Sequence, residues 1–116
     1  MGSGPVRTGP DTRGMAERHT DRRFVDEVPR LLEARRMSIR QLARLAGVTD
    51  AHLSRVLRGA DYKSVSESLA RRVAISLELP EDYFPEVREA VVIERVRRDG
   101  RFRDELYQRL QRALSS

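Results

Sequence analysis

Hydrophobic side chains recur at steps of three and four residues along most of this chain, and this spacing predicts helices rather than strands. The first helix is expected from about Asp21 or Asp26 to Arg36. Pro29 falls inside this range, where a proline removes a helical hydrogen bond and clashes with the preceding turn. The helix therefore either begins near Asp26, with Pro29 in its first turn, or kinks at the proline.

Two short helices joined by a tight turn are predicted between Ser38 and Gly59. Ser38 and Gln41 have the spacing of a capping box, which begins the first of them. Gly47 ends it, because glycine readily adopts the positive φ found just past a helix C-terminus. Thr49 then caps the second helix, and Gly59 ends it. The side chains expected to face the core are Leu42, Ala43, Ala46, Leu53, Val56 and Leu57.

A fourth helix is predicted over about residues 65–77, after a polar loop at 60–63. Ser64 and Glu67 have capping-box spacing, which places the start of this helix near Val65. The positions expected to be buried are Leu69, Val73, Ala74 and Leu77.

Two prolines mark the next elements, and the pattern changes from Pro85 onward. Pro80 suits the first turn of a short fifth helix that contains Tyr83 and Phe84. Pro85 opens another helix, and Asp99-Gly100 interrupts the chain before the last one. An apolar stripe on each of these two helices predicts an αα-hairpin. The stripes consist of Val87, Ala90, Val91 and residues 93–96 on one helix, and of Phe102, Leu106, Leu110 and Ala113 on the other.

These elements divide the chain into three parts. Residues 1–20 are rich in Gly, Pro, Thr and Arg and have almost no apolar side chains, so this arm is expected to be disordered. Residues 21–84 form a helical domain. Residues 85–116 form the C-terminal helical hairpin, whose apolar stripes must be buried against something.

Composition narrows the possible classes of protein. The chain has 116 residues, enough for one domain with tails. It has no cysteine, which excludes disulfides, thiolate metal sites and cysteine nucleophiles. Its longest apolar run, residues 90–93, is far shorter than the roughly 20 residues of a membrane span. No signal-peptide pattern is present at the start, so a soluble cytoplasmic protein with no membrane contact is expected.

The net charge of +5 comes entirely from the region around the short helix pair. Residues 35–63 carry seven basic and two acidic side chains, whereas residues 1–34 carry six of each and residues 64–116 carry ten of each. This clustering favours a surface that meets phosphate groups over a merely solvated face.

Short sequence elements that together carry a family resemblance are spread over residues 28–84. They are Met37-Ser38, Leu42-Ala43, Gly47-Val48-Thr49, Leu53, Arg58-Gly59, Leu69, Val73-Ala74, Leu77, Leu79 and Tyr83-Phe84. In these elements the chain resembles the lambda-repressor/Cro-like (XRE-type) helix-turn-helix family. The resemblance implies an all-α, five-helix repressor-like domain, followed here by the C-terminal helical hairpin. In this family the third helix, here residues 49–58, reads DNA in the major groove, commonly as a dimer.

Position within that family assigns six residues to the DNA bases: Thr49, Asp50, Ala51, His52, Ser54 and Arg55. Arg55 is the strongest candidate, because a guanidinium can bond two acceptors on guanine. Ala51 suits a thymine methyl group. Asp50 either accepts from cytosine or simply favours the positive N-terminus of its helix. His52 is either a reader or an exposed polar residue.

A second set is assigned to DNA phosphates: Arg40, Gln41, Arg44, Arg58, Tyr62 and Lys63. Members of the family often have a glutamine where this chain has Ile39, so Arg40 or Gln41 would replace that contact. Each arginine of the set also has a plain alternative as a solvated side chain. About five to seven phosphate contacts would make log affinity fall steeply with log salt, by about 0.9 per contact.

These features predict a sequence-specific, repressor-type transcription regulator that binds double-stranded DNA as a homodimer. The C-terminal hairpin either supplies the dimer contact or packs only on its own domain. One alternative is an antitoxin-like interaction module that covers a protein partner with its C-terminal helices. A second is an RNA-binding or nucleoid-associated basic protein.

Patterns typical of catalysis are missing from the sequence. The two histidines, His19 and His52, lie far apart, with no metal-ligand spacing. There is no phosphate-loop glycine pattern and no nucleophile elbow. We therefore expect no enzyme activity, no cofactor and no metal.

Overall fold

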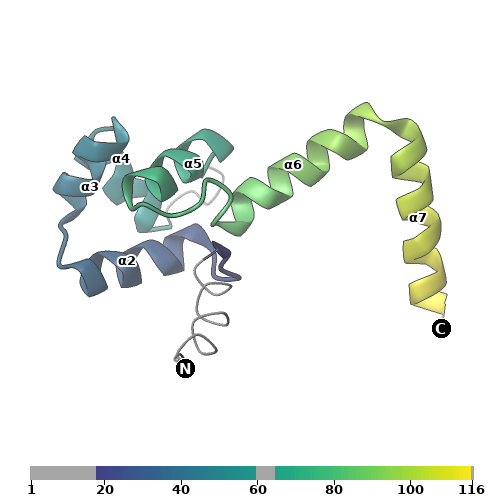
Figure 1. Cartoon of the computed structure of the whole chain (residues 1–116), viewed down its shortest axis with the longest axis horizontal. Helices are drawn as coiled ribbons and strands as arrows, with labels where there is room; N and C mark the ends of the chain where they lie inside the picture. Colours follow the sequence, from purple (N-terminus) through teal and green to yellow (C-terminus); the bar gives the residue numbers. More distant parts are fainter. Residues whose placement is uncertain (1–17, 60–64, 116) are drawn as a thin grey trace, which may run out of the picture.

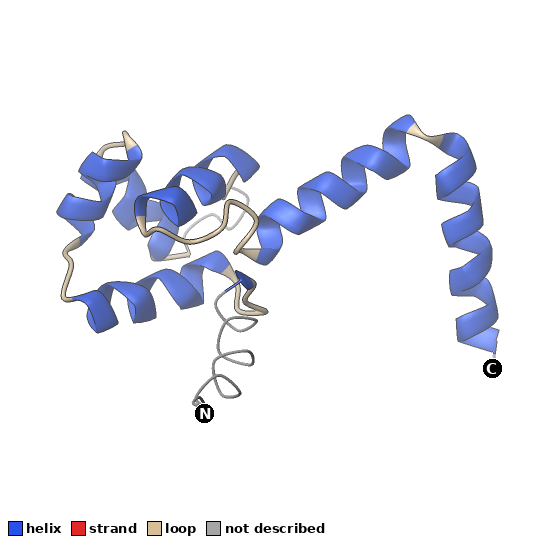
Figure 2. Ribbon diagram, viewed as in Figure 1, coloured by secondary structure: helices blue, strands red, loops and turns tan. Residues whose placement is uncertain are grey.

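Six helices and no strand make up the part of the chain that the computed structural model describes, residues 18–59 and 65–115 (Figure 2). In order they are α2 (Phe24–Arg35), α3 (Ile39–Ala46), α4 (Asp50–Leu57), α5 (Glu67–Ser76), α6 (Pro85–Arg98) and α7 (Gly100–Ser115). The first four surround one core, and α6 and α7 extend away from it as an arm (Figure 1). The predicted all-α fold is confirmed.

The core lies between α2, α3, α4, α5 and the start of α6. Wholly buried side chains come from every one of these elements, among them Phe24, Leu42, Leu53, Val73 and Val87. Burying a side chain of this kind contributes roughly 1.5–3 kcal/mol, so these contacts fix how the helices pack. The inward faces predicted for α3, α4 and α5 are confirmed. Only Leu57 is partly exposed, although it packs against the core.

Local caps set the boundary between α3 and α4 as predicted. Ser38 Oγ accepts from the Gln41 N–H at 3.0 Å, and Gln41 Oε1 accepts from the Ser38 N–H at 2.8 Å, which completes the capping box. Gly47 ends α3 with φ +75°. The next amide, Val48 N–H, donates to the Ala43 carbonyl at 3.0 Å. Thr49 Oγ1 then accepts from the His52 N–H at 3.0 Å and begins α4.

α2 begins at Phe24, between the two predicted starts at Asp21 and Asp26. Pro29 therefore lies inside the helix rather than in its first turn. A distant side chain stabilises this start, because the Glu86 carboxylate of α6 accepts from the Phe24 N–H at 3.0 Å. Proline has no N–H to donate to the carbonyl group one turn earlier in the helix. Because Pro29 is exposed, water can donate a hydrogen bond to that carbonyl group instead.

The start of α5 differs from the prediction. Ser66, not Ser64, is the N-cap, and its Oγ accepts from the Leu69 N–H at 3.1 Å. Ser64 itself lies outside the described residues. Val65 packs against the core just before the cap, at the position where a hydrophobic side chain commonly fixes the direction in which the chain enters a helix.

Residues 80–84 form a turn instead of the predicted short fifth helix. The Tyr83 N–H donates to the Pro80 carbonyl at 3.0 Å. Phe84 is extended, with φ −86° and ψ 142°, and is the N-cap of α6. Pro85 explains this conformation, because a residue before proline is disfavoured in the helical region. Pro85 itself begins α6, as predicted.

The two C-terminal helices are present, but they diverge in an open V instead of lying side by side as a hairpin (Figure 1). Only Asp99 separates α6 from α7, whereas helices that return alongside each other need a loop of about two to five residues. Asp99 Oδ1 caps α7 by accepting from the Phe102 N–H at 3.0 Å. Arg95 fixes the elbow, because its Nε lies 3.1 Å from Asp99 Oδ2 and its guanidinium 4.7 Å from the centre of the Phe102 ring.

The predicted disordered arm, residues 1–20, lies mostly outside the described residues. Its described end is held in place, in contrast to the prediction. The Thr20 N–H donates to the Tyr83 carbonyl at 2.9 Å. Arg88 donates in turn to the Thr20 carbonyl at 2.7 Å. The ordered domain therefore begins before Asp21.

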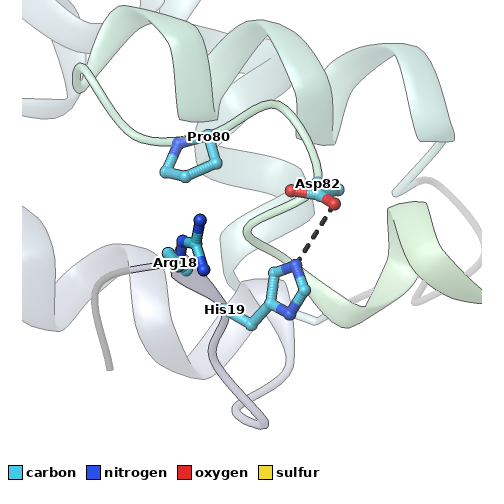
Figure 3. A pocket seen from close by; sticks show the side chains of 4 residues that line it. All are labelled: Arg18, His19, Pro80 and Asp82. Atoms are coloured by element: carbon cyan, nitrogen blue, oxygen red, sulfur yellow. Dashed lines mark ion pairs between the residues drawn. The ribbon is translucent and has the colours of Figure 1, made fainter. Parts of the chain in front are cut away.

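An open pocket lies where this end of the chain meets the turn before α6 (Figure 3). His19 Nε2 lies 3.2 Å from Asp82 Oδ2, and Arg18 and Pro80 complete the lining. The His19 contact lowers the pKa of the Asp82 carboxyl group. The pair fastens the N-terminal end of the domain to the turn.

A buried carboxylate ties α2 to the same turn. Glu27 is 3% exposed. It accepts from the Tyr83 hydroxyl at 2.6 Å and pairs with Arg30 at 2.8 Å. Burial and the neighbouring Glu27 carboxylate raise the pKa of Tyr83 to about 12.

The Gly47 corner yields a stability prediction. Gly47→Ala should lower the free energy of unfolding by about 1–2 kcal/mol, because a side chain is disfavoured at positive φ. No other group lies within 4 Å of the added Cβ, so the cost is that of the backbone alone. Glu78 has φ +61° without being glycine, so Glu78→Gly should stabilise the fold by about 0.5–1 kcal/mol. Urea denaturation measures both changes in the free energy of unfolding. A Gly47→Ala protein as stable as the parent would contradict the left-handed conformation of Gly47.

The Tyr83 contact yields a prediction on pH. The Tyr83 pKa is raised from 10.0 to about 12, so the folded chain keeps a proton that the unfolded chain loses. The stability from this group is therefore present below about pH 10 and is lost as pH rises through about 12. Tyr83→Phe should flatten this part of the profile. At pH 7 it should cost about 1–3 kcal/mol, because Glu27 loses a buried donor. Superimposable profiles of parent and variant in denaturant titrations would refute this role.

Candidate nucleic-acid interface

α4 turns one face to the core and the opposite face to solvent. Leu53 and Val56 are buried. Ala51 and Arg55, one helical turn apart, are exposed. Together with Asp50, Ser54 and Arg58 they line an open depression on the outer surface of the helix. The predicted base-facing residues thus lie on one exposed surface, with the exceptions described next.

Two of the predicted base-facing residues already have partners within the protein. The Thr49 hydroxyl is the N-cap of α4 and bonds the His52 amide. The Asp50 carboxylate lies 3.5 Å from Arg40 Nε on α3, and it also lies in the first turn of α4, where the helix dipole favours a negative charge. These contacts favour the structural alternative for Asp50 over a contact with cytosine. His52 and Ser54 are half-buried at the edges of the surface.

The predicted phosphate-facing residues are exposed wherever the structure describes them. Arg40, Gln41 and Arg44 lie on α3, and Arg58 follows the last residue of α4. The Gln41 side chain is held in the capping box, which fixes its place beside the N-terminus of α3. Tyr62 and Lys63 lie outside the described residues.

Positive charge without a carboxylate partner is concentrated in this part of the surface. Four arginines around α3 and α4 have no carboxylate partner within residues 18–59 and 65–115: Arg36, Arg44, Arg55 and Arg58. About half of the described arginines elsewhere are paired, as Arg71 is with Glu67 and Glu81. A guanidinium with no internal partner keeps all its donors for a ligand, and phosphate is the anion that its geometry suits.

Arg36 was not among the residues assigned to the site from the sequence. It ends α2 in the left-handed conformation, with φ 54°, and its side chain is exposed just before the N-terminus of α3. Its position in the basic segment was visible in the sequence, but its closeness to α3 depends on how α2 ends.

The arm leaves this surface open. α6 and α7 extend from the side of the domain that lies away from α3 and α4 (Figure 1). Among the described residues, no group of His, Cys, Asp and Glu side chains is placed to hold a metal ion. Within the same part of the chain, no helix is both long and apolar enough to cross a membrane. What the surface of α3 and α4 offers to a ligand is the exposed guanidinium groups of its arginines.

Comparison with known proteins agrees with this geometry. Residues 30–84 match the sequence model of a helix-turn-helix family. No curated protein and no solved structure matches the chain. The matched range begins within α2 and ends at Phe84, so it contains the α3–α4 pair and α5. The resemblance to the lambda-repressor/Cro-like (XRE-type) family is thereby confirmed over residues 30–84, which form a helix-turn-helix domain of that type.

Proposed function

We propose that the chain is a sequence-specific transcription regulator of the repressor type, which binds double-stranded DNA as a homodimer and inserts α4 into the major groove. The observation that carries this proposal is the exposed, unpaired guanidinium of Arg55 on a helix whose start is fixed by the Gly47 corner. A side chain that recognises a base must be held in a fixed position. Here the buried side chains on the opposite face of α4 hold the helix in place.

The dimensions of α4 suit the groove. A helix with its side chains is about 10–12 Å wide, and the major groove is about 12 Å wide. The eight residues of α4 rise about 12 Å, which spans three to four base pairs. Ala51 and Arg55 would then face neighbouring base pairs, Arg55 toward guanine and Ala51 toward a thymine methyl group. Thr49 and Asp50 orient the helix end, while His52 and Ser54 lie at the edges of the contact.

Phosphate contacts would flank the groove on both sides of α4. Arg44 and Arg58 are free to bond phosphate oxygens, and Arg36 extends the same basic surface toward α2. Arg40 would exchange its pairing with Asp50 for a phosphate. Tyr62 and Lys63, which follow α4 in the sequence and lie outside the described residues, keep their proposed role as phosphate contacts.

The arm supports the homodimer and also a second candidate function. Its exposed apolar side chains include Val92 and Ile93 on α6 and Leu110 on α7. A dimer through this arm would present two α4 helices to half-sites about one DNA turn apart. The same side chains also suit an antitoxin-like module that covers a protein partner. Co-purification of a small, untagged second protein with the tagged chain would favour that alternative.

Substitution of single arginines tests the groove assignment. Arg55→Ala should relax base preference at one position of a selected site and cost about 1–3 kcal/mol there. Arg44→Ala should weaken binding to selected and random DNA alike. Arg97→Ala, which removes an exposed arginine from α6, is the matched control and should leave both affinities close to those of the parent. The assignment fails if Arg55→Ala and Arg97→Ala give the same base preference in gel-shift competition.

Salt titration counts the phosphate contacts. Log affinity should fall linearly with log salt, with a slope near −0.9 per contact and about five to seven contacts per domain. Arg58→Ala should reduce the magnitude of this slope by about one contact, because its guanidinium has no carboxylate partner in the described chain to compete with phosphate. A slope that is flat, or that Arg58→Ala leaves unchanged, would exclude the proposed phosphate set.

A further inference from the structure

α7 packs no side chain into the core of the domain. None of its 16 residues is buried. Isolated helices of roughly this length are marginal in water, because most helical stability in proteins comes from packing of an apolar face. Ion pairs within α7, such as Arg101 with Glu105, contribute only about 0.2–0.5 kcal/mol each. The helix therefore needs a surface to pack against.

That surface cannot be α6 of the same chain. The two helices are separated by Asp99 alone, which is too short a connection for α7 to turn back along α6. The elbow is also held open from within, by the Asp99 cap on α7 and by the contacts of Arg95 with Asp99 and Phe102.

Both halves of a complementary surface are nevertheless present. On α6 the stripe opposite the buried Val87 consists of the exposed Val92 and Ile93 and the half-buried Val96. On α7 the stripe consists of Phe102, Leu106, Tyr107, Leu110 and Leu114. We infer that α7 of one copy packs along the α6 stripe of a second copy, and reciprocally, so that two chains exchange their C-terminal helices. The inference rests on the homodimer of the proposed function and specifies how that dimer is built.

A second copy of the chain fits this surface for two reasons. A reciprocal exchange forms two equivalent contacts between an α6 stripe and an α7 stripe, related by a twofold axis, which is the commonest symmetry of homodimers. A short connection between two helices also favours such exchange. The apolar area supplies most of a weak interface. Five half-exposed or more exposed apolar side chains, Val92, Ile93, Tyr107, Leu110 and Leu114, offer roughly 400 Å² per copy. Two copies would bury roughly 800 Å² of apolar surface, and the polar rim must add the remainder of the about 1,000 Å² that a specific interface should exceed.

The oligomeric state of the full chain, measured without DNA by light scattering after size exclusion, is the first test. The parent should be a dimer at micromolar concentration. Leu110→Glu should shift it to monomer by at least a tenfold increase in dissociation constant. It should not unfold the domain, because Leu110 is 53% exposed and lies outside the core. Gln108→Glu, on the opposite face of α7, is the matched control and should remain dimeric. A parent chain that is monomeric up to about 100 µM overturns the inference.

Crosslinking separates exchange from other dimers, since the chain has no cysteine of its own. Chains with one cysteine on α6, at Val92 or Ile93, are mixed with chains with one cysteine on α7, at Leu106 or Leu110. Exchange predicts that disulfides form mainly in the mixture. Disulfides formed mainly between two α7 cysteines overturn it, as does crosslinking that requires an added protein partner. None of these outcomes bears on whether α4 binds DNA, so failure here leaves the groove assignment to its own tests.

Discussion

The turn from α3 into α4 is the constraint on which the rest of the structure depends. Gly47 takes a conformation that other residues disfavour, and Val48 and Thr49 then close the end of one helix and the start of the next. Leu53 anchors α4 in the core. Once these contacts are made, the direction in which Arg55 points is set by the backbone and not by a flexible loop. The cationic surface of the domain is a consequence of this corner.

The sequence predicted best what depends on neighbours along the chain. The capping box at Ser38, the corner at Gly47 and the cap at Thr49 each involve residues within a few positions of one another, and all three are confirmed. Predictions that depended on distant contacts were less accurate. α2 begins at Phe24, where Glu86 of α6 accepts from the first amide of the helix. α5 begins later than predicted, with Ser66 as its cap and Val65 packed on the core just before it. Neither contact can be read from local spacing.

Similar limits apply to the candidate site. Helical periodicity separates the buried from the exposed positions of α3 and α4. The exposed surface that holds Ala51 and Arg55 was therefore predictable. The pairing of Asp50 with Arg40 joins two different helices, so helical spacing alone does not predict it. Local sequence does not reveal that Glu27 is buried, because its partner Tyr83 is far away in sequence. The elbow shows a different limit: two apolar stripes indicated a hairpin, but the length of the connection decides whether one chain can form it.

The groove assignment of α4 is tested most directly by a crosslinker placed on that helix. Ala51→Cys would be the only thiol in the chain. It would carry a photoactivated group and be bound to DNA selected from a random pool. The account predicts crosslinks to bases exposed in the major groove of the selected site, and few to random DNA under competition. Crosslinks that arise from a cysteine at Gln108 on α7 but not from one at Ala51 would contradict it.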